Sequence, residues 1–154
     1  MCLLRLNGEP FDNYEVELIK AVMTSLALAL RKMGKTVTVL NADPVPGNLA
    51  FLPGADTVVH EEDGSGYDVA VIVDCGSPDR TGFVQEELRK PPIMVNVDHH
   101  RTNGFGGDFC LVDPEAPATG MLVHRILVAM GAEIDYDVAV NIYVAILTDT
   151  GSFR

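Results

Sequence analysis

Positive charge is scarce in this 154-residue sequence. It has 11 lysines and arginines against 22 aspartates and glutamates, for a formal net charge of −11. Because affinity for a nucleic-acid backbone rests on lysine and arginine, this balance argues against an extended nucleic-acid surface. An anionic substrate would therefore need local positive charge, either from a bound metal ion or from a few arginines.

Cysteine is also scarce, and long uncharged apolar runs are absent. Three cysteines, Cys2, Cys75 and Cys110, form an odd and scattered set that predicts no disulfide framework and fits a reducing cytoplasm. The apolar start at residues 1–5 is too short for a signal peptide. The longest apolar helix expected, over residues 14–33, carries glutamates, lysines and an arginine, so we expect no membrane span and a cytoplasmic protein.

Helix and strand signals alternate along the chain. Apolar residues at spacings of three and four, or short runs between turn signals, predict helices over 14–33, 81–88, 117–130 and 137–147. Apolar, mostly β-branched runs predict strands over 36–40, 58–59, 69–73, 93–97 and 109–112. Residues 41–54, rich in proline, predict an ordered loop, and residues 1–13 give only turn signals.

This alternation predicts an α/β fold, with a doubly wound, mostly parallel sheet and helices on both faces. The uninterrupted apolar run over 69–73 is typical of a central parallel strand. We expect residues 1–154 to form a single domain with an atypical stretch over 1–13.

Two of the predicted strands are followed directly by ionisable side chains. Asp74 follows the strand over 69–73, and Asp98, His99 and His100 follow the strand over 93–97. Ligands of such sheets bind at the carboxyl ends of the strands, where these residues are expected. Imidazole and carboxylate together suit manganese, iron, cobalt or zinc. Because adjacent strand residues point to opposite faces, the two histidines are expected to have different roles.

Asp149, near the end of the last predicted helix, is a third candidate. Taken alone, Asp74 could be a helix cap or turn former, and Asp149 could belong to an ordinary helix-end turn in Thr-Asp-Thr-Gly. In combination with the Asp-His-His stretch, they predict a metal site.

These stretches carry a family resemblance. Residues 71–74 (VIVD), 97–100 (VDHH) and 147–151 (LTDTG) resemble motifs two, three and four of the DHH phosphoesterases. Further stretches, 101–103, 111–114 and 118–120, together with Asp108, are similar to the branch that contains nanoRNases, 3′-phosphoadenosine 5′-phosphate (pAp) phosphatases and cyclic-dinucleotide phosphodiesterases. The resemblance covers about residues 24–154.

The resemblance implies a metal-dependent phosphoesterase that hydrolyses short oligonucleotides or nucleotide phosphates by two-metal activation of water. It implies that Asp74 bridges two manganese ions and that His99 and Asp149 complete the shell of the second, with magnesium or cobalt as alternatives. It also places His100 near the scissile phosphate and Asp98 behind the histidines, orienting them.

Three further side chains are candidate substrate contacts. Arg101 could bind phosphate, with a solvated surface arginine as the alternative. Asn103 could touch substrate. Thr119, near a predicted helix start, could offer backbone N–H groups to an anion, although simple capping explains it equally.

The sequence departs from the family in two places. The family begins with His-x-x-Pro-Asp-x-Asp before its first helix, and residues 7–13 keep only Pro10. The family also continues beyond motif four into a smaller domain, DHHA1, whereas this sequence stops at Arg154. We therefore expect an incomplete DHH domain with one bound ion or none and impaired activity. The alternative is a non-catalytic module that binds one metal ion or a nucleotide, or serves assembly. An exposed apolar patch on the last helix, and with it a homodimer, is expected.

Overall fold

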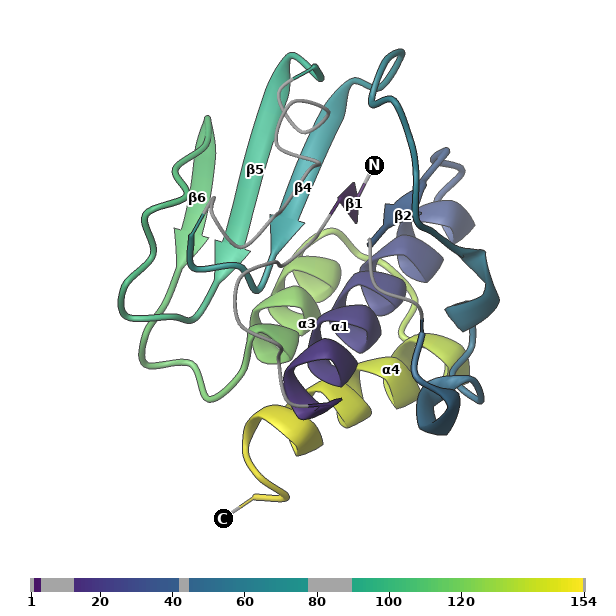
Figure 1. Ribbon diagram of the computed structural model, residues 1–154, viewed down its shortest axis with the longest axis vertical. Coiled ribbons are helices and arrows are strands. Elements are labelled where there is room, and N and C mark those ends of the chain that lie inside the picture. Colours follow the sequence, from purple (N-terminus) through teal and green to yellow (C-terminus); the bar gives the residue numbers. More distant parts are fainter. Residues whose placement is uncertain (1, 4–12, 42–44, 78–89, 154) are drawn as a thin grey trace.

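The computed structural model describes residues 2–3, 13–41, 45–77 and 90–153. These residues form a six-stranded parallel sheet of order β3-β2-β1-β4-β5-β6 (Figure 1). The strands are β1 (Cys2–Leu3), β2 (Val39–Leu40), β3 (Val58–Val59), β4 (Val69–Val73), β5 (Ile93–Asp98) and β6 (Phe109–Val112). The predicted α/β class and the parallel sheet are confirmed.

The chain winds outward in two directions from the middle of the sheet. From β1 it runs to β2 and β3 on one side, and then crosses over to β4, β5 and β6 on the other. The direction of winding therefore switches between β1 and β4. In doubly wound sheets this switch point opens a crevice at the carboxyl ends of the strands, where ligands bind.

Strands β4 and β5 form the longest pair. Their register runs from Val69 opposite Ile93 to Val73 opposite Val97, so both strands end at nearly the same level. The backbone N–H of Asp74 then donates to the carbonyl of Val97 at 2.9 Å. This register places the residues that follow β4 beside those that end β5.

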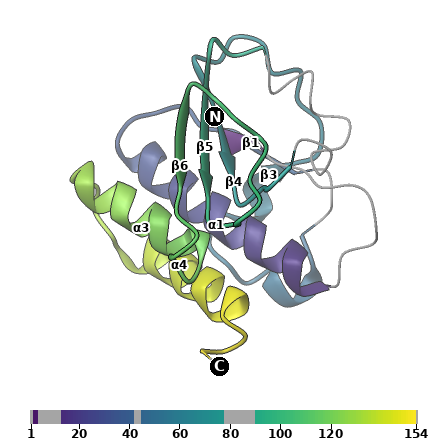
Figure 2. The ribbon, with the colours of Figure 1, turned by 90° about the vertical axis from the view of Figure 1, so that its left-hand side faces the viewer.

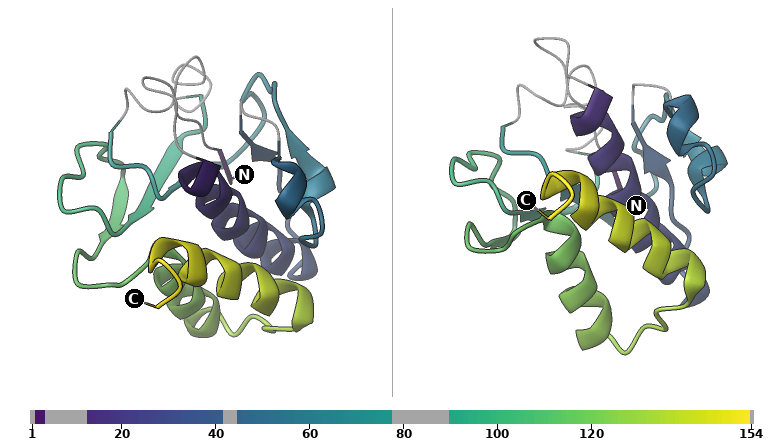
Figure 3. Two further views of the ribbon diagram at one scale, coloured as in Figure 1. Left: turned by 60° about the horizontal axis from the view of Figure 1, so that its bottom comes forward. Right: turned by 90° about the horizontal axis from the view of Figure 1, so that it is seen from below.

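Three helices lie in the described part of the chain: α1 (Asn13–Lys32), α3 (Thr119–Ala129) and α4 (Tyr136–Asp149). Helices α1 and α3 contact the sheet, and α4 packs against both of them as part of one helical layer (Figure 3). Figure 2 views the domain from the β6 edge, with α3 beside the strands. No helix among the described residues has the length and apolar character needed to cross a membrane.

Both faces of the central strands carry buried side chains. Val71 and Val97 face the side of α1 and α3, while Ala70 and Ile72, fully buried, alternate to the opposite face. The helix predicted over 81–88 lies outside the described residues. On the last helix, Tyr143 is 54% exposed, and its ring lies 6.2 Å from that of the exposed Phe153 at an angle of 48°.

The elements differ from the expected ones in two places. The strand expected over 36–40 is shortened to Val39–Leu40, and the guanidinium of Arg31 donates to the carbonyl of Val37, just before it, at 2.8 and 3.1 Å. That carbonyl belongs to the link between α1 and β2 instead of a strand ladder. Strand β1 was not expected at all, since two residues are too few to show a pattern.

Gly120 allows α3 and α4 to approach closely. A Cβ atom at this position would lie 3.0 Å from the Cβ of Ala145 and 3.4 Å from Cγ1 of Ile146. The contact fixes the start of α3, beside Thr119, against the last turns of α4, which end at Asp149.

A larger side chain at this contact should therefore destabilise the domain. We expect Gly120→Val to lower the free energy of unfolding by about 1–3 kcal/mol, the usual cost of overpacking, as measured by urea unfolding. Adding Ala145→Gly to this variant removes the opposing methyl group and should recover part of the loss. Equal stability of wild type and Gly120→Val would contradict the close packing of α3 on α4.

Candidate metal centre

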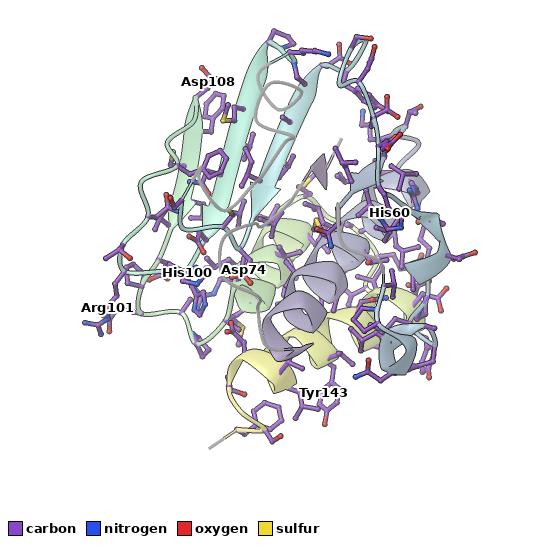
Figure 4. The ribbon with its side chains drawn as sticks, viewed as in Figure 1. His60, Asp74, His100, Arg101, Asp108 and Tyr143 are labelled. Carbon is purple, nitrogen blue, oxygen red and sulfur yellow. The ribbon has the colours of Figure 1, made fainter. Side chains whose placement is uncertain are left out.

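Carboxylate and imidazole groups from three parts of the chain meet at the carboxyl edge of the sheet. Asp74 follows β4, His99 and His100 follow β5, and Asp149 ends α4. Asp74, His99 and His100 each offer a ligand atom, and these atoms lie within 4.8 Å of one another. Figure 4 shows Asp74 and His100 side by side below the ends of β4 and β5.

Asp74 enters the site through an unusual backbone conformation. Its φ of 60° lies in the left-handed region, which aspartate tolerates better than most residues. The side chain is buried, and its Oδ1 accepts a hydrogen bond of 2.6 Å from the hydroxyl of Thr119. Burial raises the pKa of Asp74, although the Thr119 hydrogen bond opposes the rise. The structure thus holds a costly buried carboxylate in place with a single hydroxyl donor.

His99 has its ring orientation set by a backbone carbonyl. Its Nδ1 lies 3.2 Å from the carbonyl oxygen of Ala116, which can only accept a hydrogen bond. Nδ1 therefore carries the proton of the neutral ring, and Nε2 carries the lone pair. That Nε2 lies 3.2 Å from Oδ2 of Asp149 and 3.8 Å from Oδ1 of Asp74. A backbone acceptor behind a histidine is a common arrangement for metal ligands.

Asp149 presents a buried oxygen that lacks a hydrogen-bond donor. No described residue donates to its Oδ2, despite the nearby Nε2 of His99. Burial raises the pKa of Asp149 to about 6, and the negative charge of Asp74 adds to the rise. Two electron-pair donors facing each other without a proton between them are stabilised by a cation.

The donor set fits a divalent transition metal. Two carboxylates and an imidazole suit manganese, iron, cobalt or zinc. Ligand atoms sharing one ion at bond lengths of about 2.1 Å lie roughly 3.0–3.4 Å apart. The separation of 3.2 Å between His99 and Asp149 is in this range, and that of 3.8 Å between His99 and Asp74 is slightly wider. Asp74, His99 and Asp149 are therefore the residues that could hold an ion.

Asp98 lies behind the two histidines. It is fully buried, and its Oδ1 accepts from the backbone N–H of His99 at 2.8 Å and from Nδ1 of His100 at 2.6 Å. Its Oδ2 accepts from the side-chain amide of Asn103. Burial alone would raise the pKa of Asp98, but the hydrogen bonds from His100 and Asn103 outweigh it and hold the pKa below its usual value. Asp98 is thus an ionised acceptor that fixes the histidine loop.

His100 is the most exposed member of the cluster, with 37% of its side chain exposed. Because the ionised Asp98 can only accept, Nδ1 of His100 is protonated, and Nε2 carries the lone pair of the neutral ring. The two histidine rings are 5.0 Å apart and nearly edge to face. The sequence expectation that the two histidines have different environments agrees with this geometry.

The three predicted substrate contacts lie in different surroundings. Arg101 is exposed and points away from Asp74, so the structure does not bring it into the cluster (Figure 4). Asn103 is occupied with Asp98, and Thr119 is buried beneath Asp74. Their contacts with substrate stay predictions. Residues 4–12, where the sequence departs from motif one, lie outside the described residues.

Sequence reasoning missed two participants. The carbonyl of Ala116 orients His99, and a backbone acceptor has no side-chain signal in a sequence. Asn96, whose amide donates to Asn103, was detectable, since it is the only polar residue in the run over 93–97.

Comparisons with known proteins agree with the fold. The chain is 35% identical over 140 residues to the bifunctional oligoribonuclease and PAP phosphatase NrnA of Thermus thermophilus, a match that spans 87% of this chain and 40% of that protein. It is 31% identical over 85 residues to an uncharacterized protein of Mycoplasma pneumoniae, spanning 55% of this chain and 26% of that one. No protein-family profile matches the chain.

The fold matches that of an exopolyphosphatase-related protein from Bacteroides fragilis, with a TM-score of 0.87 and 21% identity over 99% of this chain and 46% of that one. At this identity the likeness shows the fold alone. The chain thus spans less than half the length of these proteins. Together, the comparisons show a sequence relationship to NrnA over most of this chain and a shared α/β fold.

Metal binding should depend on His99 and not on histidine in general. We expect isothermal titration with Mn²⁺ to show binding to the wild type and a loss of affinity of at least about 100-fold in His99→Ala, more than loss of an outer partner usually costs. His60, at the far end of the sheet, is the matched control, and His60→Ala should bind as the wild type does (Figure 4). Equal affinity in His99→Ala would contradict the site.

The metal-free protein should gain stability when Asp149 loses its charge. The folded pKa of Asp149, about 6, lies above its ordinary value of 3.8, so ionisation of Asp149 costs stability as the pH rises through this window. At about 1.4 kcal/mol per tenfold change in proton affinity, the cost above pH 6 is about 2–3 kcal/mol. We expect Asp149→Asn to be more stable than wild type by about this amount at pH 8 with EDTA.

The difference in free energy of unfolding between Asp149→Asn and wild type should shrink to roughly half at pH 5, where the folded wild type is mostly protonated at Asp149. Urea unfolding of both proteins at the two pH values measures it. A gap of equal size at pH 5 and pH 8 would contradict the raised pKa, because a difference in packing alone does not depend on pH.

Proposed function

We propose that this chain is the DHH domain of a metal-dependent phosphoesterase that hydrolyses short oligonucleotides or nucleotide phosphates of the 3′-phosphoadenosine 5′-phosphate type. The observation that carries the proposal is the convergence on Nε2 of His99 of the buried Asp74 and of the partly buried Asp149, whose Oδ2 has no donor among the described residues. The similarity to an oligoribonuclease and PAP phosphatase supports the choice of substrate class.

Asp74, His99 and Asp149 are the residues proposed to hold the ion, manganese first, with magnesium or cobalt as alternatives. When bound, a divalent ion supplies Lewis-acid polarisation of the phosphoryl group and a water that is nucleophilic at neutral pH. It also supplies positive charge to a protein whose formal net charge is −11, which an anionic substrate requires.

Hydrolysis of a phosphoester places a water oxygen on phosphorus and releases the ester oxygen as an alcohol. We propose that His100 faces the scissile phosphate, because it is the most exposed member of the cluster and lies beside Asp74. Its partner Asp98 keeps the proton on Nδ1, so Nε2 is the atom directed to substrate. Arg101, exposed one residue further on, is proposed to contact an outer phosphate of the substrate.

The described ligands suffice for one ion, since Asp74, His99 and Asp149 together offer one tight donor set. We therefore propose slow catalysis with a single ion. The competing function is a module that binds one ion or a nucleotide without turnover. We further propose that residues 1–154 belong to one DHH domain.

Activity should require the metal ligands. We expect Mn²⁺-dependent release of inorganic phosphate from 3′-phosphoadenosine 5′-phosphate, and of mononucleotides from a short oligoribonucleotide, with Asp74→Ala and His99→Ala each losing at least about 100-fold in kcat/KM. Release of phosphate is measured colorimetrically, and His60→Ala serves as the control with unchanged activity.

Full activity in both variants would exclude the proposed centre. Calorimetry separates the two functions, because one weak site for Mn²⁺ without turnover in the wild type favours the non-catalytic module. Turnover that disappears in EDTA and returns with Mn²⁺ favours the enzyme.

A further inference from the structure

Asn96 is a buried amide in the middle of the apolar strand β5. It has no exposed surface, and it pairs with Ile72 of β4 in the parallel register. A buried amide is costly unless it is hydrogen-bonded, so an apolar residue would be the simpler choice here. Its Nδ2 donates to Oδ1 of Asn103 at 2.9 Å, which lies in the loop that follows His100.

The direction of this hydrogen bond is fixed by the neighbours of Asn103. The amide nitrogen of Asn103 must face Asp98, because the ionised carboxylate only accepts. The amide oxygen of Asn103 must face the backbone N–H of Phe105, at 3.1 Å, because that group only donates. Asn103 therefore turns its oxygen toward Asn96, and Asn96 must be the donor.

A continuous chain of hydrogen bonds thus leads from the sheet to the site. Asn96 donates to Asn103, Asn103 donates to Asp98, and Asp98 accepts the Nδ1–H of His100. The donor and acceptor groups of each side chain in this series allow its neighbour only one orientation. Strand β5 thereby orients the side chain of Asn103, in a loop that is also anchored by the hydrogen bond from the backbone N–H of Gly104 to the carbonyl of Gly76.

We propose that Asn96 is a positioning residue for the proposed phosphoesterase reaction. It acts through Asn103 and Asp98 and sets the orientation and the tautomer of His100 without touching substrate or metal. The expected effect of Asn96 on turnover rests on the proposed function. Its effect on the tautomer of His100 does not, because that tautomer is observable in the metal-free protein. Only a side chain with a donor of this reach suits the position, since leucine has no donor and threonine is too short.

The test compares Asn96→Leu with Asn141→Leu. Asn141 is a matched control, because it is also fully buried, also has one oxygen without a hydrogen-bond partner among the described residues, and donates to the carbonyls of Pro53 and Asp137, away from the site. Nitrogen NMR of ¹⁵N-histidine-labelled, metal-free protein reports the tautomer of His100. We expect the Nδ1-protonated form in the wild type and in Asn141→Leu, and a mixture of both tautomers in Asn96→Leu.

Turnover supplies the second measurement. In the Mn²⁺-loaded enzyme we expect Asn96→Leu to lower kcat about tenfold, the low end for outer partners of a metal site, with KM nearly unchanged. Asn141→Leu should keep the wild-type kcat. The Asn96→Thr variant suits a buried strand and keeps the site packed, and it should show the same loss if Asn96→Leu fails to fold.

A double-mutant cycle tests the route. If Asn96 acts through Asn103, the Asn96→Leu change should have no further effect on kcat or tautomer in an Asn103→Leu background. Additive effects would overturn the proposal, and so would a wild-type His100 tautomer in both Asn96 variants. A changed tautomer in a protein without any turnover would instead refute the proposed function while the positioning role stands.

Discussion

A buried carboxylate, Asp74, and a partly buried one, Asp149, both beside His99, are the constraint on which this structure depends. The charge of Asp74 raises the cost of ionising Asp149, and burial raises that cost for both carboxylates. The fold brings them together through the β4–β5 register, the left-handed backbone at Asp74 and the Gly120 contact between α3 and α4. Packing elsewhere must therefore offset electrostatic repulsion at this edge, and a cation removes it.

The ends of two helices also contribute to the electrostatic potential around Asp74 and Asp149. Helix α3 begins at Thr119, so its positive end lies beside Asp74. Helix α4 ends at Asp149, so its negative end lies beside a carboxylate, where the macrodipole is unfavourable. Helix α3 thus stabilises the charge of Asp74, whereas α4 adds to the repulsion at Asp149.

Much of this arrangement was predictable from the sequence, for physical reasons. Apolar runs mark buried strands, and the carboxyl ends of parallel strands meet at one edge, so the sequence alone predicts Asp74 and Asp98 close together. The runs over 69–73 and 109–112 coincide with strands β4 and β6, respectively. What failed depends on contacts between separate elements. The side chain of Arg31 binds the carbonyl of Val37 before β2, and the carbonyl of Ala116 orients His99. Neither interaction has a local pattern.

The unpaired oxygen of Asp149 has a consequence for how the protein persists in a cell. A ligand that binds only the folded chain adds to its stability in proportion to the logarithm of the ligand concentration. A domain with unfavourable electrostatic repulsion at an ion site would therefore unfold more often when the ion is scarce. Proteases then remove the unfolded chains. The lifetime of a protein that binds an ion at such a site would therefore follow the supply of that ion.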